Sequence, residues 1–202
     1  MTVVYPVGRG LYVNLTNRCP CACRFCIRQN GEGVYGSGSL WLEREPTAEE
    51  VVAAIAAADP ASYDEVVFCG YGEPTERLDV LLEVARRIRE TSPKTPIRVN
   101  TNGLGDLIAG APTAARFKGL VDTVSISLNA PTAEEYFKVC RPKFGLDSYA
   151  AMLRFAAEVK DVVPSVVLSV VGTEDMTEEK VAACRAVCDR IGVPLRVRTY
   201  AR

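Results

Sequence analysis

The stretch LYVNLTNRCPCACRFC, residues 11–26, is the most informative part of this chain. In its first half, Leu11, Val13 and Leu15 alternate with other residue types, which is typical of a β-strand with one apolar face. Its second half holds four of the chain's eight cysteines, directly after that strand. Reactive side chains at the C-terminal end of a strand are characteristic of β/α barrels, whose active sites gather there.

The remainder of the chain alternates strand and helix patterns. Capping-box spacing at Thr47 with Glu50, and at Thr132 with Glu135, marks two helix starts. A short N-terminal hairpin is expected at residues 3–5, and the glycine-rich segment 30–39 is expected to be a loop. Such alternation predicts βαβ units and a parallel sheet. The predicted strands are 11–16, 65–69, 97–101, 123–128, 166–171 and 195–200, and the predicted helices are 47–58, 78–90, 114–118, 147–160 and 177–191.

The strands alternate between apolar and polar residues, as in Val124 and Ile126 against Ser125 and Ser127. Strands covered by helices on both faces are instead almost continuously apolar. We therefore predict an α/β fold formed by residues 1–202 as a single domain, a closed or partial barrel with a polar lumen and not an open doubly wound sheet. An antiparallel sheet with one wet face is the alternative.

The composition excludes several classes of site. The 202 residues include no histidine, which rules out Ser-His-Asp triads and histidine-containing zinc sites. No apolar run approaches the roughly 20 residues of a membrane span, and no signal peptide is evident, so a cytoplasmic protein is expected. In that compartment cysteines bind metals or do redox chemistry more often than they form disulfides.

Cys19, Cys23 and Cys26 have the spacing C-x3-C-x2-C. Thiolates this close together can share a soft metal ion or an iron–sulfur cluster. Three ligands leave one iron of a four-iron cluster open for chemistry. A structural zinc site that uses Cys21 as well is the alternative, although four such crowded cysteines suit a tetrahedral ion poorly.

With these motifs the chain resembles the radical S-adenosylmethionine (SAM) superfamily. Phe25 precedes the last motif cysteine, residues 68–75 read FCGYGEPT like that family's Gly-Gly-Glu motif, and residues 101–103 read TNG. The chain is most similar to the short radical SAM proteins associated with TatD-family hydrolases, which share the segments GYGEPT and CRP.

The resemblance implies a partial (β/α)6 TIM-like barrel whose last helix is missing, because the chain ends directly after the sixth strand. It also implies an enzyme with a 4Fe-4S cluster held by Cys19, Cys23 and Cys26. SAM on the fourth iron is cleaved by one electron, and the resulting 5′-deoxyadenosyl radical takes hydrogen from a substrate. The partners implied are SAM, a flavodoxin- or ferredoxin-like electron donor, and an unidentified and large substrate, with no membrane. A non-catalytic iron–sulfur electron carrier with Cys21 as fourth ligand is the alternative. The SAM-binding residues implied are Phe25, Gly70, Gly72, Glu73, Pro74, Asn100, Asn102, Ser127, Asn129 and Val170.

The sequence also gives expectations for several residues outside these motifs. Cys21 is either a bystander or a competing ligand, and Cys140 either a packed thiol or a hydrogen donor at the functional end. Cys69 is expected to face outward as a packed thiol, and Trp41 to anchor packing. Cys184 and Cys188, four apart on a predicted helix, are expected in the core. Arg196 and Arg198 either hold a carboxylate or phosphate in the lumen or lie at a solvated strand end.

Overall fold

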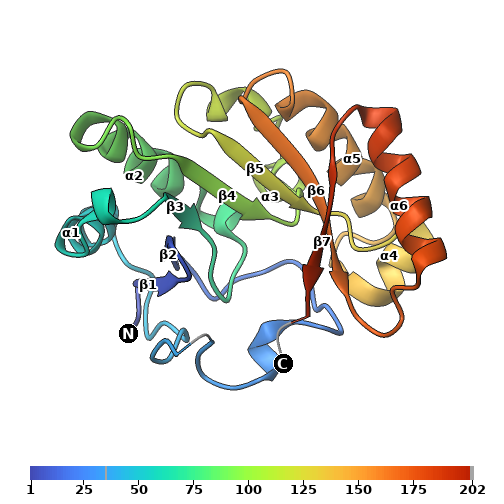
Figure 1. Ribbon diagram of the computed structural model, residues 1–202, viewed down its shortest axis with the longest axis horizontal. Coiled ribbons are helices and arrows are strands. Elements are labelled where there is room, and N and C mark those ends of the chain that lie inside the picture. The colour runs from blue at the N-terminus through green and yellow to red at the C-terminus, as the bar shows by residue number, and fades with distance from the viewer. Residues whose placement is uncertain (35, 201–202) are drawn as a thin grey trace.

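One curved sheet of seven strands organises the computed structural model of the protein, with neighbours in the order of the chain (Figure 1). The first strand pairs antiparallel with the second, and all later pairs are parallel. The structure describes residues 1–34 and 36–200; residue 35 of the predicted loop and residues 201–202 at the predicted end of the domain lie outside this description. The strands are β1 (Val4–Val7), β2 (Gly10–Val13), β3 (Glu65–Phe68), β4 (Ile97–Thr101), β5 (Thr123–Ser127), β6 (Ser165–Gly172) and β7 (Leu195–Thr199).

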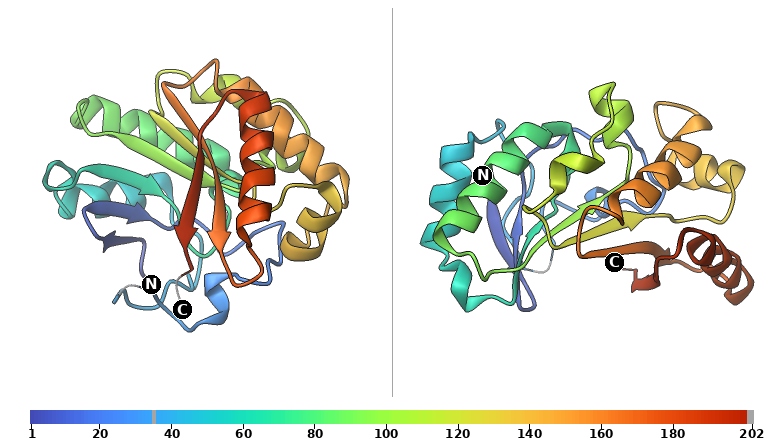
Figure 2. Two further views of the ribbon diagram at one scale, coloured as in Figure 1. Left: turned by 45° about the vertical axis from the view of Figure 1, so that its right-hand side comes forward. Right: turned by 90° about the horizontal axis from the view of Figure 1, so that it is seen from above.

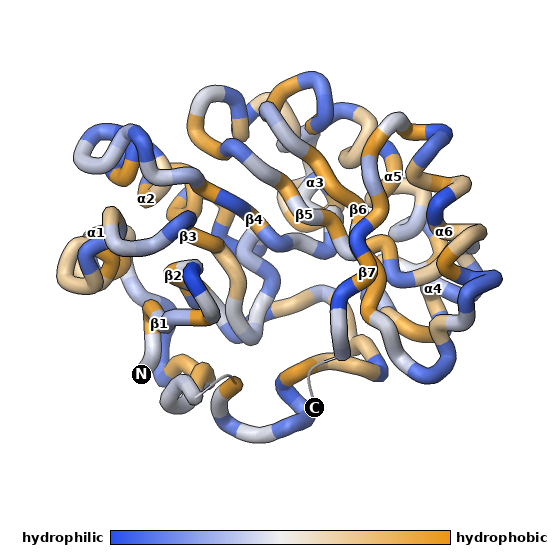
Figure 3. Tube along the Cα trace, in the orientation of Figure 1, coloured by the Kyte–Doolittle hydropathy of each residue, from blue (hydrophilic) through white to orange (hydrophobic). Residues whose placement is uncertain are grey.

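Helices cover the outer, convex face of this sheet. Seen from above, they form an arc outside the strands (Figure 2). The hydrophilic turns of α2 and α6 lie on their outer sides, away from the sheet (Figure 3). The α-helices are α1 (Ala48–Ala57), α2 (Leu78–Thr91), α3 (Gly105–Ala109), α4 (Ala133–Cys140), α5 (Asp147–Val159) and α6 (Glu178–Ile191), and 3-10 turns occupy Ile27–Gln29, Pro60–Ser62, Pro74–Arg77 and Ala114–Phe117.

Alternation along the strands separates a helix-packed face from a lumen. Val99 and Ile126 are buried in the core that also contains the inner faces of α2, α5 and α6. Arg98, Asn100 and Ser125 point to the other side and line a cavity. The partial TIM-like barrel with a polar lumen is therefore confirmed.

The helix predictions were less complete than the strand predictions. α3 was missed, whereas the predicted helix start at Thr132 is confirmed, since Thr132 caps α4 by accepting a hydrogen bond from the Glu135 N–H. The predicted helix 114–118 is a single 3-10 turn. Thr47 and Glu50 form the reciprocal capping box that was predicted.

Among the described residues, no helix is both long enough and apolar enough to cross a lipid bilayer.

Candidate active site

A cavity of about 560 Å³ occupies the concave side of the sheet at the C-terminal ends of the strands. This volume lies within the usual range for small-molecule sites. Its walls combine the three motif cysteines with residues that follow β3, β4 and β5. The structure thus brings together most of the predicted site: Cys19, Cys23, Cys26, Phe25, Gly70, Gly72, Glu73, Asn100, Asn102, Ser127 and Asn129.

The cysteine loop, residues 19–26, is tied to the segment that ends α4, residues 139–143. Cys21 and Pro142 form an antiparallel bridge. The Ala22 N–H donates to the Cys140 carbonyl at 3.0 Å, and the Arg24 N–H donates to the Val139 carbonyl at 2.9 Å. These bonds fix an otherwise irregular loop under the open end of the sheet, where Figure 1 shows it in blue.

The thiols of this loop interact with one another and with Cys140. Hydrogen bonds from the Cys140 and Cys21 thiols lower the pKa of Cys23 to about 4. The bond from Cys21 likewise lowers the pKa of Cys19, while donation to Cys19 and Cys23 raises the pKa of Cys21 itself. Thiolate is the form that binds iron. Cys19 and Cys23 are therefore the thiols of this group best prepared to act as ligands.

Arg28 organises the other end of the cysteine loop. Its Nε donates to the Cys26 sulfur at 3.3 Å, and its two terminal nitrogens reach the carbonyls of Asn17 and Cys21. Arg28 therefore ties the Cys26 side chain to the backbone at Asn17 and Cys21.

The donor set fits an iron–sulfur cluster better than a single ion. The thiolates that hold an iron–sulfur cluster each bind a different iron atom, so they lie farther apart than the ligands of a single metal ion. In the described part of the chain, no three cysteine or carboxylate groups converge closely enough to hold one metal ion. The four-cysteine zinc site considered from the sequence is not assembled there. Cys19, Cys23 and Cys26 nevertheless line one cavity.

Two glycines after β3 allow the chain to pass close to the residues that follow β2. A Cβ atom on Gly72 would stand 2.2 Å from the Thr16 carbonyl oxygen, and one on Gly70 would stand 2.1 Å from Oδ1 of Asn14. Both distances are far inside van der Waals contact. The Gly-Tyr-Gly-Glu segment can therefore lie beside the start of the cysteine loop only because it has glycine at these positions.

The next residue, Glu73, is 4% exposed and joins the ends of β3 and β4. Its Oε1 accepts from the Thr101 hydroxyl at 2.6 Å and from both the hydroxyl and the N–H of Thr75, and its Oε2 accepts from the Asn102 N–H at 2.7 Å. Burial raises the pKa of Glu73, and these hydrogen bonds oppose the rise. Pro74 begins the following 3-10 turn and does not line the cavity.

Among the described residues, several buried polar atoms on the cavity wall have no hydrogen-bond partner. They include Oδ1 of Asn100, Oδ1 of Asn129 and the hydroxyl of Tyr136. Asn129 is 5% exposed and Tyr136 is 1% exposed. Buried polar groups are normally paired, so unpaired ones on a cavity wall indicate a polar ligand.

A second cavity of about 330 Å³ adjoins the first and shares Phe25, Asn129, Val171 and Tyr200 with it. Val170, the predicted adenine neighbour, is not on this wall: it is fully buried in the core under the helices. Val171 is the residue of β6 that faces the cavities. Because successive residues of a strand point to opposite faces, the prediction missed by one residue.

Some of the remaining expectations from the sequence are confirmed and others are wrong. Cys184 and Cys188 are buried in the core, as predicted. Cys69 faces the lumen, not outward as predicted, because Phe68 takes the helix-facing position. Trp41 packs edge-on against Tyr71, with ring centroids 5.1 Å apart, and remains 41% exposed.

Tyr136 lines the cavity and was not among the residues predicted from the sequence. It lies on α4, whose start at Thr132 was predicted but whose extent was not. Arg98, a polar member of an alternating strand, lines the cavity as the prediction of a polar lumen requires. Arg28, which contacts the Cys26 sulfur, was not singled out from the sequence.

Comparison with known proteins settles the family. The model of the radical SAM superfamily matches residues 13–186. The chain belongs to the radical SAM superfamily.

Relatives of this radical SAM chain differ in what they act on. It is 32% identical over 126 residues to GTP 3′,8-cyclase of Streptomyces coelicolor, covering 61% of this chain and 33% of that protein. It is 30% identical over 133 residues to the "Probable dual-specificity RNA methyltransferase RlmN" of Acidothermus cellulolyticus, covering 57% and 28%. The chain thus matches about a third of the length of these relatives.

Two solved structures share the fold of this chain. SuiB of Streptococcus suis, bound to its precursor peptide SuiA, superposes with a TM-score of 0.70 at 16% identity over 98% of this chain and 40% of SuiB. A radical SAM methyltransferase from Sphaerobacter thermophilus gives 0.67 at 18% identity, over 97% and 68%. At these identities the likeness concerns the fold alone.

Proposed function

We propose that the chain is a radical SAM enzyme in which Cys19, Cys23 and Cys26 hold a 4Fe-4S cluster. The observation that carries the proposal is that these three cysteines line one cavity together with the Gly-Tyr-Gly-Glu segment. When bound, the cluster supplies the electron that cleaves SAM to methionine and a 5′-deoxyadenosyl radical. The residues of the chain itself bind and orient SAM and the substrate, and they exclude water from the site.

The Glu73 carboxylate is suited to hold the SAM amino group. Its Oε1 is saturated by three donors, whereas Oε2 accepts only the Asn102 N–H among the described residues. Oε2 therefore retains a lone pair for an ammonium, in a site where burial strengthens a charge-assisted hydrogen bond.

The two adjoining cavities suit the length of SAM. Asn100, Asn102, Ser127 and Asn129 surround the first cavity and offer amide and hydroxyl groups to a ribose. The second cavity, behind Phe25 and Val171, is the proposed place for the adenine. Val171 takes the role that the sequence had given to Val170.

Anaerobic reconstitution tests the proposal. The loaded protein should contain about four irons per chain and, with dithionite and SAM, should release 5′-deoxyadenosine. Cys23→Ala should remove the cluster and lower 5′-deoxyadenosine formation at least 100-fold, because one iron loses its only protein ligand. Iron content, absorbance near 400 nm and product quantification are the measurements.

Cys21→Ala is the matched control in the same loop. It should retain the iron and the SAM cleavage, because Cys21 lies outside the C-x3-C-x2-C spacing. Loss of the cluster in Cys21→Ala, with retention in Cys23→Ala, would reverse the ligand assignment.

The burial of Cys21 between Cys19 and Cys23 supports a second candidate function, a non-catalytic electron carrier. In that case Cys21 completes the four ligands and leaves no iron for SAM. Reconstituted protein that holds four irons but does not bind SAM would favour the carrier.

The relatives bear on the proposed substrate. The cyclase acts on GTP, the methyltransferase on RNA, and SuiB was solved with a peptide. We include in the proposal a large substrate, an external flavodoxin- or ferredoxin-like donor, and a relationship to the radical SAM proteins associated with TatD-family hydrolases. Chemistry that needs reduced thiols also favours a cytoplasmic location.

A further inference from the structure

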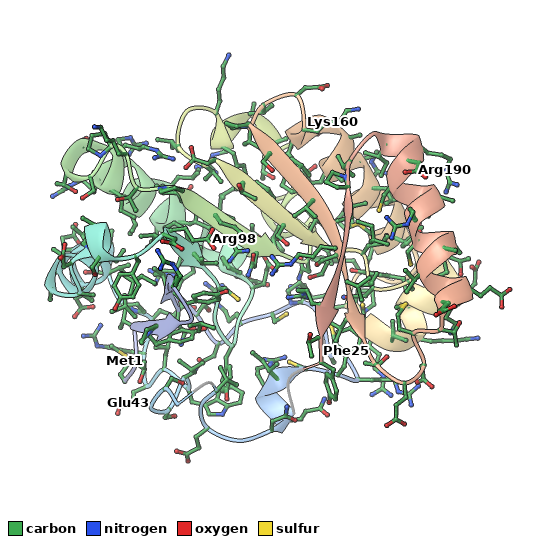
Figure 4. All side chains as sticks on the ribbon, in the orientation of Figure 1. Met1, Phe25, Glu43, Arg98, Lys160 and Arg190 are labelled. Atoms are coloured by element: carbon green, nitrogen blue, oxygen red, sulfur yellow. The ribbon has the colours of Figure 1, made fainter. Side chains whose placement is uncertain are left out.

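A guanidinium group contacts one of the proposed cluster ligands. Arg28 lies in a 3-10 turn directly after the cysteine loop, close to the Phe25 that Figure 4 labels. Its Nε donates to the Cys26 sulfur at 3.3 Å. Its terminal nitrogens donate to the carbonyls of Asn17 and Cys21, at 3.3 and 3.4 Å. Three contacts with fixed groups leave the guanidinium group little freedom to turn away from Cys26.

An aromatic ring lies over the same guanidinium group. The Cζ atom of Arg28 is 6.0 Å from the centroid of the Trp41 ring, within the range of a cation–π contact. Trp41 packs edge-on against Tyr71, whose hydroxyl donates to the Gly31 carbonyl at 2.8 Å. Because the ring takes the place of water on this side, the charge of Arg28 is less screened than that of an exposed arginine.

The charge of Arg28 is directed at the cysteines. Within the described part of the chain no carboxylate forms an ion pair with Arg28, and its partners there are a sulfur, two carbonyls and an aromatic ring. Burial lowers the pKa of the guanidinium group, but the hydrogen bond to Cys26 and the charges of the three motif cysteines raise it above its ordinary value. The cation therefore interacts with all three proposed ligands.

We propose that Arg28 raises the reduction potential of the cluster that Cys26 helps to hold, and that Trp41 shields Arg28 from water for this role. Reduction by the external donor adds one electron to a cluster that three thiolates already make negative. A nearby cation and an N–H···S hydrogen bond favour the reduced form, since net charge, hydrogen bonds to the sulfurs and solvent exposure all set cluster potentials. This inference rests on the proposed function, because it requires the cluster, but it does not require SAM cleavage.

Redox titration of the reconstituted protein without SAM tests the inference. The electron paramagnetic resonance signal of the reduced cluster reports the midpoint potential. In Arg28→Gln the equilibrium constant for one-electron reduction should fall about tenfold or more, and a tenfold fall lowers the midpoint potential by about 59 mV. Arg28→Lys should lower the potential less, because it keeps the charge and loses the Nε donor. Trp41→Leu should also lower it less, because water then screens the guanidinium group.

Arg24→Gln is the matched control in the same loop. Arg24 is exposed, and no hydrogen bond joins its side chain to the sulfur of a described cysteine, so solvent screens its charge and the midpoint potential should not change. The other charges of the cavity, Glu73 included, are the same in every variant, so the comparison isolates Arg28.

The outcomes separate this inference from the proposed function. An unchanged potential in Arg28→Gln with the iron retained, or an equal fall in Arg24→Gln, would overturn the inference and leave the proposed function standing. If Arg28→Gln does not assemble the cluster, unchanged potentials in both Arg28→Lys and Trp41→Leu would overturn it. A lowered potential in Arg28→Gln, in a protein whose unaltered form does not cleave SAM, would count for this inference and against the proposed function.

Discussion

At the scale of single residues, the site depends on close approaches that side chains would prevent. The obstacle at Gly70 is the Asn14 side chain, which is itself held by a 2.7 Å hydrogen bond from Nδ2 to the Leu40 carbonyl. The obstacle at Gly72 is backbone, the carbonyls of Thr16 and Arg18. A side chain can rotate, whereas a carbonyl that belongs to the fold can move only with its loop.

Gly72→Ala should therefore lower the free energy of unfolding by about 1–3 kcal/mol, the usual cost of overpacking. It should also lower the iron content after reconstitution, because the displaced carbonyls lie at the start of the cysteine loop. Urea unfolding and iron analysis are the measurements. Gly105→Ala is the control, because its nearest obstacle is a Thr113 hydroxyl at 3.1 Å, and alanine favours helix α3. Equal effects of the two substitutions would contradict the argument.

The sequence was most informative where a residue type has few chemical uses. Clustered thiols after a strand indicated a metal or cluster site, the resemblance to the radical SAM superfamily added the Gly-Tyr-Gly-Glu segment, and both line one cavity. Val170 and Cys69 were assigned to the wrong faces of their strands. A shift of one residue along a strand exchanges its two faces, and the sequence does not mark which residue begins the alternation.

At the scale of elements, α1 shows how capping and charge act together. The Thr47 hydroxyl accepts from the Glu50 N–H, and the Glu50 carboxylate accepts from the Thr47 N–H at 2.9 Å. Arg44 and the Thr47 N–H lower the pKa of Glu50 to about 2. The folded state thus prefers the ionised carboxylate, so this contribution is present above the ordinary glutamate pKa and is lost as pH falls toward 2.

Glu50→Gln should accordingly lower the free energy of unfolding at pH 7. The difference in free energy of unfolding between this variant and the unaltered protein should shrink as the pH falls from about 4 toward 2. Thr47→Ala, which should cost about 1 kcal/mol, removes the hydroxyl acceptor at every pH and serves as the comparison. Urea midpoints at several pH values measure both. A Glu50→Gln difference that does not change with pH would refute the role of the charge.

The elements that were predicted well have long, regular patterns. Strand β4 matches its predicted range, and α6 was predicted one residue too long. α3 has five residues, too few for a periodic pattern to be recognised. α4 has eight residues and buries only Tyr136 and Cys140, and its packing against the cysteine loop is a tertiary contact that local sequence does not reveal.

At the scale of the whole molecule, the cysteine loop and the end of α4 form one unit although more than a hundred residues separate them. Backbone hydrogen bonds connect residues 20–24 with residues 139–143. A ligand that binds only the folded state stabilises the segments that it contacts and those that are bonded to them. A cofactor bound by the cysteine loop should therefore also stabilise the distant end of α4.

Hydrogen exchange before and after cluster reconstitution should show this coupling. Amides of residues 19–29 and 139–143 should exchange at least several-fold more slowly in the loaded protein, while those of α2 should change little. Protection confined to residues 19–29 would show that the two segments move independently.

The walls of the cavity contain no imidazole, since the chain has no histidine. This simplifies the spectroscopy of the reduced protein. In many metalloproteins a nitrogen-14 coupling in the electron paramagnetic resonance of an iron centre has to be divided between histidine and a bound small molecule. In the untagged form of this protein, a strong nitrogen coupling that appears upon addition of SAM can be assigned to SAM without competition from histidine, and SAM labelled with nitrogen-15 only at its amino group would show whether that group is the source.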